Sequence, residues 1–254
     1  MHANRFSLEG RNALVIGGTS GIGNAIASGF AQAGAKVIVA GRTPAKLERA
    51  VEKLKALGKA HGYCADVRDL DALGGLVKTT LADHGRIDVL VNSQGITILK
   101  PAEEFQAQDW DEIMLTNLRS VFFACTEVGR HMLAQGSGAI INLASLASYR
   151  GWPRSALYGI SKAGVVNLTE TLAAEWAGRG VRVNAIAPGF ILTDMNRDKM
   201  SPERKERAVS RTPMGRFGET VDMAGTAVFL ASDASSFVTG ETIRVDGGFL
   251  AAGI

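Results

Sequence analysis

Short apolar runs alternate along this chain with longer segments in which apolar residues recur every three or four positions. Nearly unbroken apolar runs are typical of parallel strands that are covered on both faces. The runs that predict strands are Asn12–Ile16, Lys36–Ala40, Ala60–Ala65, Ile87–Val91, Ala139–Leu143, Val181–Ala187 and Thr242–Val245. The helical spacing is clearest in Gly21–Gly34, Pro44–Leu57 and Leu70–His84. The alternation predicts an α/β fold in which residues 1–254 form one doubly wound parallel sheet of about seven strands, with helices on both faces.

One segment breaks this rhythm. Residues 193–216 are polar and contain Pro202 and Pro213. A long excursion late in an α/β domain is often a mobile element over the active site, although a plain surface loop has the same composition. We therefore interpret residues 193–216 as a substrate-binding lid.

Composition narrows the class of protein. The 254 residues are 46% apolar and 21% charged, as in an ordinary soluble domain, and the net charge is only +3. Because basic and acidic residues are interspersed, no nucleic-acid partner is predicted. No apolar run is long enough for a membrane span and the N-terminus lacks the pattern of a signal peptide, which predicts a cytoplasmic protein.

Two cysteines, Cys64 and Cys125, lie in apolar runs and form no motif with the four histidines. Their place inside apolar runs predicts buried free thiols, and hence a reducing compartment. No metal site is predicted, because the cysteines and histidines lack the spacing of metal ligands.

A glycine-rich turn follows the first predicted strand. Its sequence is Gly17-Gly18-Thr19-Ser20-Gly21-Ile22-Gly23, and an apolar helix begins within it. Glycines allow the backbone to turn sharply and to approach a pyrophosphate, while the amides of a helix N-terminus bind the anion. The order G-x-x-x-G-x-G differs from the common dinucleotide fingerprint, but its place between strand and helix predicts nucleotide binding.

The end of the second predicted strand bears on the choice of cofactor. An acidic residue at this place binds the 2′-hydroxyl of NAD, whereas this chain has Arg42 and Thr43 there. A guanidinium pairs well with a 2′-phosphate. The sequence therefore predicts a preference for NADP(H), with NAD(H) as a possible second cofactor and a solvated surface arginine as the alternative interpretation.

Candidate acid–base chemistry comes from Tyr158 and Lys162, four residues apart, with Ser145 thirteen positions upstream. Residues four apart share a helix face. A cation beside a phenol favours the phenolate and lowers its pKa from about 10, which would bring an acid–base group closer to neutral pH. The alternatives are a pair on a solvated helix face and a serine that only caps a helix.

Taken in order, these motifs resemble those of the short-chain dehydrogenase/reductase family over nearly the whole chain. Asn92-Ser93-Gln94-Gly95 is similar to the family's Asn-Asn-Ala-Gly motif, and Pro188-Gly189 and Val245-Asp246-Gly247-Gly248 also match. Two departures stand out. Ile16 replaces a threonine before the glycine turn, and Ser93 and Gln94 replace asparagine and alanine, which predicts an effect on cofactor affinity or loop stability.

The resemblance implies a Rossmann-type fold and a role for each matching residue. Asp66 and Val67 would contact the adenine, and Thr193 would meet the nicotinamide carboxamide. Lys162 would bind the nicotinamide ribose and lower the Tyr158 pKa, and Asn117 would hold a water that links Lys162 to solvent. The implied catalytic residues are Asn117, Ser145, Tyr158 and Lys162. The implied cofactor-binding residues are Gly17, Thr19, Ser20, Gly21, Ile22, Gly23, Arg42, Thr43, Asp66, Val67, Asn92, Gly95, Tyr158, Lys162, Pro188, Gly189, Ile191 and Thr193.

The activity so implied is interconversion of a secondary alcohol and a ketone on a small-molecule substrate, with Tyr158 as acid and base. The chain resembles gluconate 5-dehydrogenase-like and 3-oxoacyl-carrier-protein-reductase-like members. Polar Thr97, Lys100 and Arg150 favour a sugar acid or polyol such as gluconate. Reduction of a 3-oxoacyl thioester is the alternative, and a non-catalytic NADP(H) sensor is another. The family commonly forms homotetramers, so a homotetramer is predicted.

Overall fold

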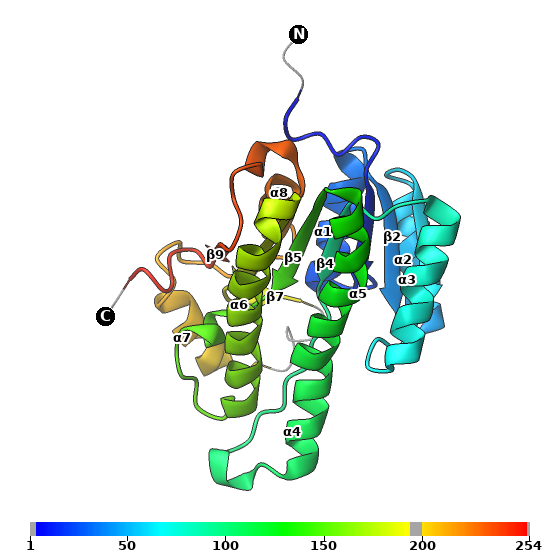
Figure 1. The fold of residues 1–254 in the computed structure, drawn as a ribbon. Coiled ribbons are helices and arrows are strands. Elements are labelled where there is room, and N and C mark those ends of the chain that lie inside the picture. The colour runs from blue at the N-terminus through cyan, green and yellow to red at the C-terminus, as the bar shows by residue number, and fades with distance from the viewer. Residues whose placement is uncertain (1–3, 194–199, 253–254) are drawn as a thin grey trace.

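A seven-stranded parallel sheet runs through the molecule in the order β3-β2-β1-β4-β5-β6-β9 (Figure 1). The structure is a computed structural model and describes residues 4–193 and 200–252. The seven strands are β1 Asn12–Ile16, β2 Lys36–Gly41, β3 Ala60–Cys64, β4 Val89–Asn92, β5 Gly138–Leu143, β6 Val181–Pro188 and β9 Thr242–Val245. Two short strands, β7 Ile191–Leu192 and β8 Gly218–Glu219, pair separately. The predicted doubly wound, Rossmann-type domain is confirmed.

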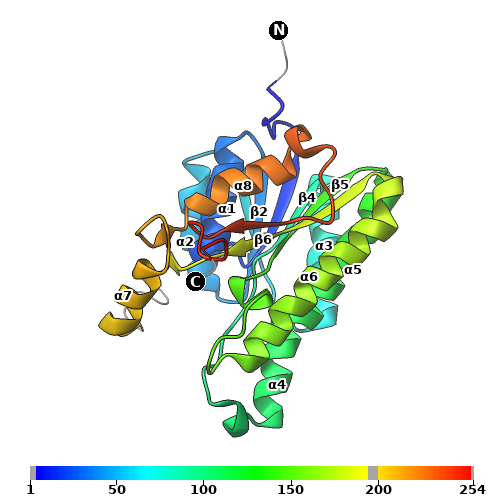
Figure 2. The ribbon, with the colours of Figure 1, turned by 90° about the vertical axis from the view of Figure 1, so that its left-hand side faces the viewer.

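Helices cover both faces of the sheet (Figures 1 and 2). One buried cluster joins α3, α5 and α6 to one face, and a second joins α1, α2 and α8 to the other. A π-helical turn, Leu115–Arg119, connects α4 to α5. The helices are α1 Gly21–Gln32, α2 Pro44–Lys55, α3 Leu70–His84, α4 Ala107–Met114, α5 Ser120–Gln135, α6 Ala156–Trp176, α7 Pro202–Ser210 and α8 Asp222–Ala231. Short 3-10 turns are Ala102–Glu104, Leu146–Ser148, Ala177–Arg179 and Asp233–Ser235.

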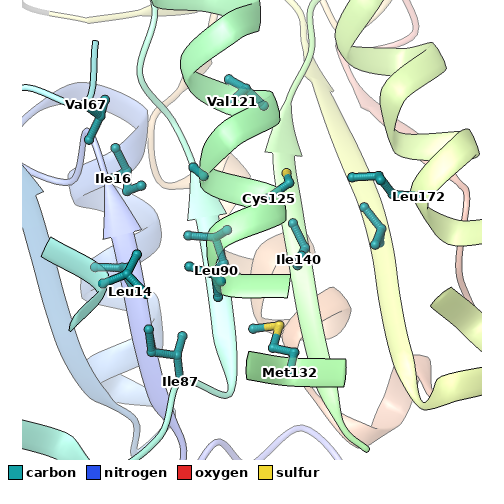
Figure 3. Packing of buried hydrophobic residues seen from close by; sticks show 14 of the residues in the cluster. Leu14, Ile16, Val67, Ile87, Leu90, Val121, Cys125, Met132, Ile140 and Leu172 are labelled. Atoms are coloured by element: carbon teal, nitrogen blue, oxygen red, sulfur yellow. The ribbon is translucent and has the colours of Figure 1, made fainter. Parts of the chain in front are cut away.

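The two clusters explain why the central strands are apolar throughout. Side chains of a strand alternate between the faces of a sheet. In β1, Leu14 and Ile16 enter the cluster under α3, α5 and α6, part of which Figure 3 shows. Ala13 and Val15 enter the opposite cluster. A strand buried on both faces favours apolar side chains at successive positions, as Ala13–Ile16 show, which is why an unbroken apolar run predicted it.

Strand β4 begins later than predicted. The expected range was 87–91, and the ladder occupies Val89–Asn92. Ile87 is fully buried, but pairing with β1 starts at Val89. Just before it, the carboxylate of Asp88 accepts the backbone N–H of Asn12 at 2.8 Å. A side chain thus takes part in joining the two strands where the backbone ladder has not yet begun.

The two cysteines differ in their surroundings. Cys125 is buried in α5, as predicted, and burial raises the pKa of its thiol to about 12. The prediction for Cys64 is wrong, because this thiol is exposed. Cys64 ends β3, the edge strand of the sheet, so less of the protein covers it than covers a central strand. Within residues 4–193 and 200–252, no helix is long and apolar enough to cross a membrane.

The direction in which successive strands are added to the sheet reverses between β1 and β4. From β1 the chain first builds outward to β2 and β3, then returns to add β4 on the other side. At such a switch point the loops after the two central strands diverge and leave a crevice at their carboxyl ends. The glycine turn follows β1, and Ser93, Gln94 and Gly95 follow β4, so both segments lie at this crevice.

Candidate active site

The glycine turn is packed so closely that two of its positions admit no side chain. Gly17 has φ +78°, and a Cβ on it would lie 2.8 Å from the backbone nitrogen of Gln94. A Cβ on Gly23 would lie 2.4 Å from the carbonyl oxygen of Gly17. Gly21 instead has φ +54°, and among the described residues only the Thr193 methyl, at 3.7 Å, lies within 4 Å of a Cβ placed there. The turn is therefore tight against the protein and open toward the crevice.

The N-terminus of α1 is suited to an anion. Its N-cap residue, Ser20, makes no capping hydrogen bond with its side chain, and the first turn of the helix contains no acidic residue. Asn24 donates to the carbonyl of Gly18 at 3.1 Å and so fixes the turn that precedes the helix. Helix amides without side-chain caps, beside glycines that leave room, fit the pyrophosphate of a dinucleotide.

At the end of β2, Arg42 is exposed and forms no hydrogen bond with the described residues. The carboxylate of Asp66, which follows β3, is paired with the guanidinium of Arg68. Arg68 Nε donates to Asp66 Oδ1 at 2.9 Å. That hydrogen bond is the main cause that lowers the pKa of Asp66, and Arg42 contributes a smaller Coulombic effect. On this side the crevice therefore has an exposed cation, Arg42, and an ionised carboxylate, Asp66, whose charge is paired with Arg68. Val67 is buried in the core.

Asn117 lies in the π-helical turn and is fully buried. Its Oδ1 accepts the backbone N–H of Ile96 at 2.8 Å, and its Nδ2 donates to the carbonyl of Ile96 at 2.9 Å. The same Nδ2 donates to Ser161 Oγ at 3.1 Å. Asn117 thus bonds to Ile96 and Ser161, which belong to other segments, rather than to the backbone of its own helix.

Ser145 and Tyr158 meet at the carboxyl end of β5. Ser145 Oγ accepts the backbone N–H of Ala147 at 3.2 Å as the cap of a 3-10 turn. Ser145 also lies close enough to the phenol of Tyr158 for hydrogen bonding by its side chain to lower the pKa of that phenol. The two roles weighed for this serine, cap and partner of the phenol, are therefore both present.

Burial raises the pKa of Tyr158, and the hydrogen bond with Ser145 lowers it by less. The expected lowering by Lys162 is not found in the protein alone. Lys162 Nζ lies 6.0 Å from the centre of the Tyr158 ring and donates to the carbonyl of Leu143 at 2.6 Å. The ammonium is thus directed to the backbone of β5, and burial lowers its own pKa to about 8.

The segment after β6 completes the crevice. A Cβ on Gly189 would lie 2.6 Å from the Cα of Asp246, so the ends of β6 and β9 touch there. Ile191 pairs with Gly218 across β7 and β8. Thr193 reaches the glycine turn at Gly21. The part of the expected lid at 194–199 lies outside the described residues, and the remainder contains α7.

Comparison with known proteins agrees with a dinucleotide-binding oxidoreductase site at this crevice. The family model described as enoyl-(acyl carrier protein) reductase matches residues 17–250. The chain belongs to the short-chain dehydrogenase/reductase family. It is therefore an NAD(P)-dependent oxidoreductase that acts on a small-molecule substrate.

Two relatives with different names are equally similar. Gluconate 5-dehydrogenase of Gluconobacter oxydans is 41% identical over 249 residues, which cover 97% of each chain. The 3-oxoacyl-[acyl-carrier-protein] reductase of Thermotoga maritima is 42% identical over 244 residues, 96% of this chain and 99% of that one. A gluconate 5-dehydrogenase from Burkholderia cenocepacia, solved with NADP and tartrate, has a TM-score of 0.94 at 37% identity and covers 98% of both chains.

Within this short-chain dehydrogenase/reductase, some contacts of the site were not predicted from the sequence. Ser161 donates to the carbonyl of Tyr158 at 2.8 Å and accepts from Asn117, which links two candidate catalytic residues. Its position three residues after Tyr158, on the same helix, was the available signal. Trp152 packs against Phe190 and Phe249 with ring centres 5.5 and 5.6 Å away. Those three rings are distant in sequence, so no local pattern predicts their contact.

One residue proposed to flank the substrate is already paired. Lys100 Nζ donates to both carboxylate oxygens of Asp109, at 2.8 and 2.7 Å. Arg150 and Arg154, on the loop between Ser145 and Tyr158, are exposed. Neither guanidinium forms a hydrogen bond with the described residues. Of the cations considered for the substrate, Lys100 is thus engaged with Asp109, whereas these two arginines have no hydrogen-bond partner for their guanidinium among the described residues.

Proposed function

We propose that this enzyme interconverts a secondary alcohol and a ketone with NADP(H), and that its substrate is a sugar acid or polyol such as gluconate and 5-ketogluconate. The observation that carries the proposal is that Ser145, Tyr158 and Lys162 lie together after the carboxyl end of β5, with Lys162 next to the loop that contacts the glycine turn. NADP(H) supplies the hydride chemistry when bound.

The acid–base assignment follows from the surroundings of the phenol. A raised pKa keeps Tyr158 protonated at neutral pH, which suits donation to a carbonyl oxygen during reduction. Ser145 hydrogen-bonds at the same point and is placed to stabilise negative charge on that oxygen. Lys162, with a pKa of about 8, is mostly cationic at neutral pH. Its charge would favour the phenolate in the opposite direction, where Tyr158 accepts a proton.

Arg42 supports NADP(H) over NAD(H). Its guanidinium stands exposed at the end of β2, where the 2′-phosphate of the adenosine ribose is expected. No aspartate or glutamate replaces it between Gly41 and Pro44. The related gluconate 5-dehydrogenase from Burkholderia cenocepacia was solved with NADP.

A carboxylate-bearing substrate is supported by charge. Arg150 and Arg154 are exposed between the two candidate catalytic residues and can pair with an acid. Tartrate, a hydroxy acid, accompanies NADP in that related structure. Reduction of a 3-oxoacyl thioester is the second candidate, because the Thermotoga maritima reductase is just as similar, and the same arginines would then meet an acidic carrier protein.

Residues 193–216 form part of this proposal as a substrate-binding lid whose described portion is held at its base by β7 and β8. A homotetramer and a cytoplasmic location also stay predictions.

The test compares substrates directly. Purified enzyme is assayed with gluconate and NADP+, with 5-ketogluconate and NADPH, and with an acetoacetyl thioester and NADPH. Turnover of the sugar acid is expected, and it should weaken in Arg150→Ala and Arg154→Ala mainly through KM. Arg179→Ala is the control, because Arg179 is exposed just before β6, at the opposite edge of the sheet. Activity confined to the thioester would replace the proposed substrate with the second candidate.

A further inference from the structure

Gln94 is built into the buried contact between the loop after β4 and the start of α5. The residue is 9% exposed, and its side-chain Nε2 donates to Ser120 Oγ at 3.2 Å and to Asn92 Oδ1 at 3.5 Å. Ser120 in turn donates to the carbonyl of Thr116 at 2.7 Å. Thr116 belongs to the π-helical turn that carries Asn117. The Gln94 carboxamide therefore ties the loop to the turn that supplies a candidate catalytic residue.

A second set of hydrogen bonds holds the same loop two residues later, at Ile96. Asn117 holds both the N–H and the carbonyl of Ile96. Gly95 lies between the hydrogen-bonded residues Gln94 and Ile96. A Cβ on Gly95 would lie 3.5 Å from both Lys162 Nζ and Asn117 Oδ1. The positions of Gln94 and Ile96 thus determine how the backbone at Gly95 faces Lys162.

The other side of the loop touches the glycine turn. A Cβ on Gly17 would meet the backbone nitrogen of Gln94 at 2.8 Å, and a Cβ on Gly23 would meet Ser93 Oγ at 2.9 Å. Contacts this close leave no space between loop and turn. A shift at Gln94 would therefore move the backbone that supports the pyrophosphate-binding turn and the backbone beside Lys162 together.

Gln94 also brings a cost that an apolar residue would avoid. Its Oε1 is buried and has no hydrogen-bond partner among the described residues. A buried acceptor without a partner is unfavourable. The alanine that is common in the family at this position has no side-chain acceptor and avoids this cost. A contribution to stability is therefore a poor explanation for this glutamine, whereas a contribution to the geometry of the cofactor site fits both its contacts and its cost.

We propose that Gln94 is a positioning residue, which through Ser120 fixes the loop between the glycine turn and Lys162 and thereby sets the affinity for NADP(H). The inference rests on the proposed function, which assigns that cofactor to this crevice. It concerns a residue outside the predicted cofactor-binding set, and it gives the departure from the family motif a specific consequence.

The test uses Gln94→Met, which keeps the length of the side chain and removes its hydrogen bonds. The Kd for NADPH is measured by isothermal titration calorimetry, Tm by scanning calorimetry, and kcat and KM on the best substrate found. We expect Kd to rise about three- to tenfold, the effect of one neutral hydrogen bond, with kcat nearly unchanged and Tm not lowered.

Ser120→Ala removes the partner on α5 and should raise Kd to a similar extent, and the double variant should bind no more weakly than either single one. Thr80→Val is the matched control. Thr80 is a fully buried hydroxyl that bonds to the carbonyl four residues before it, at 2.7 Å, as Ser120 does, but on α3. Its removal should leave Kd unchanged.

The outcomes separate the two proposals. If the wild-type enzyme does not bind NADPH, the proposed function fails and this inference fails with it. If the wild type binds and Gln94→Met binds equally well, or loses only Tm, the positioning role alone is overturned. Should Gln94→Met fail to fold, Ser120→Ala decides by itself, and an unchanged Kd in that variant overturns the role.

Discussion

Asn117 holds the backbone of Ile96 at both ends, accepting its N–H at 2.8 Å and donating to its carbonyl at 2.9 Å. Through Ser161 the same amide reaches the carbonyl of Tyr158. A single buried side chain therefore connects the loop after β4 with the helix that carries the phenol. Both N–H groups of its amide donate to protein, whereas Oδ1 accepts one hydrogen bond and keeps a second lone pair, so the predicted water that links Lys162 to solvent stays a prediction.

Replacement of Asn117 by alanine should lower both stability and activity. Two backbone groups of Ile96 would lose their partner inside the protein, at a cost of about 1–3 kcal/mol each where water does not replace it. Urea unfolding and kcat/KM measure the two losses. Asn184→Ala is the control, because Asn184 is equally buried and bonds Val238 and Glu241 away from the crevice. It should lose stability but keep kcat, and a control that loses kcat as strongly would show that Asn117 acts through stability alone.

Tyr158→Phe should abolish most turnover while the protein stays folded and binds NADPH. Loss of a positioned acid costs on the order of 10²–10⁴-fold in kcat. Ser145→Ala should lose on the order of 10²–10³-fold, the effect of removing one donor at a developing oxyanion. Steady-state kinetics measure both, with Tyr149→Phe as the control, since Tyr149 is 43% exposed near Ser145. Near-wild-type kcat in Tyr158→Phe would remove the proposed acid.

Arg42→Ala should lower kcat/KM with NADPH about tenfold or more, because a charge-assisted hydrogen bond to phosphate is lost. The value with NADH should change little. Lys53→Ala, an exposed cation later on α2, controls for the loss of net charge. Equal kcat/KM for the two cofactors in the wild-type enzyme would contradict the predicted preference.

Lys162 should make stability rise with pH above 8. Burial lowers its pKa in the folded protein from 10.5 to about 8. Below pH 8 both states hold the proton and the contribution is constant. Between 8 and 10.5 the unfolded chain holds a proton that the folded protein has lost, so the free energy of unfolding increases through this window.

The difference between wild type and Lys162→Met isolates this residue. Urea unfolding at neutral pH and at about pH 10 should show a steeper increase for the wild type than for the variant. Parallel pH dependence in the two proteins would show that the ammonium is not desolvated as its surroundings indicate.

The sequence by itself determined the succession along the chain of the seven strands of the main sheet, the place of the glycine turn, and the spacing of Ser145, Tyr158 and Lys162. These are local properties, because double-sided burial leaves an apolar run, a tight turn needs glycine, and a helix brings residues four apart onto one face. The place of Arg42 at the end of β2 could be predicted for the same reason, since it follows from the strand before it.

Only the tertiary structure decided which side chains meet and how they titrate. The contacts of Asn117 with Ile96 and of Gln94 with Ser120 join segments more than twenty residues apart. The raised pKa of Tyr158 and the exposure of Cys64 depend on how much water reaches each group, and that is set by elements elsewhere in the chain. Spacing along a helix brought Tyr158 and Lys162 together, but packing directed the ammonium toward Leu143, which the sequence does not specify.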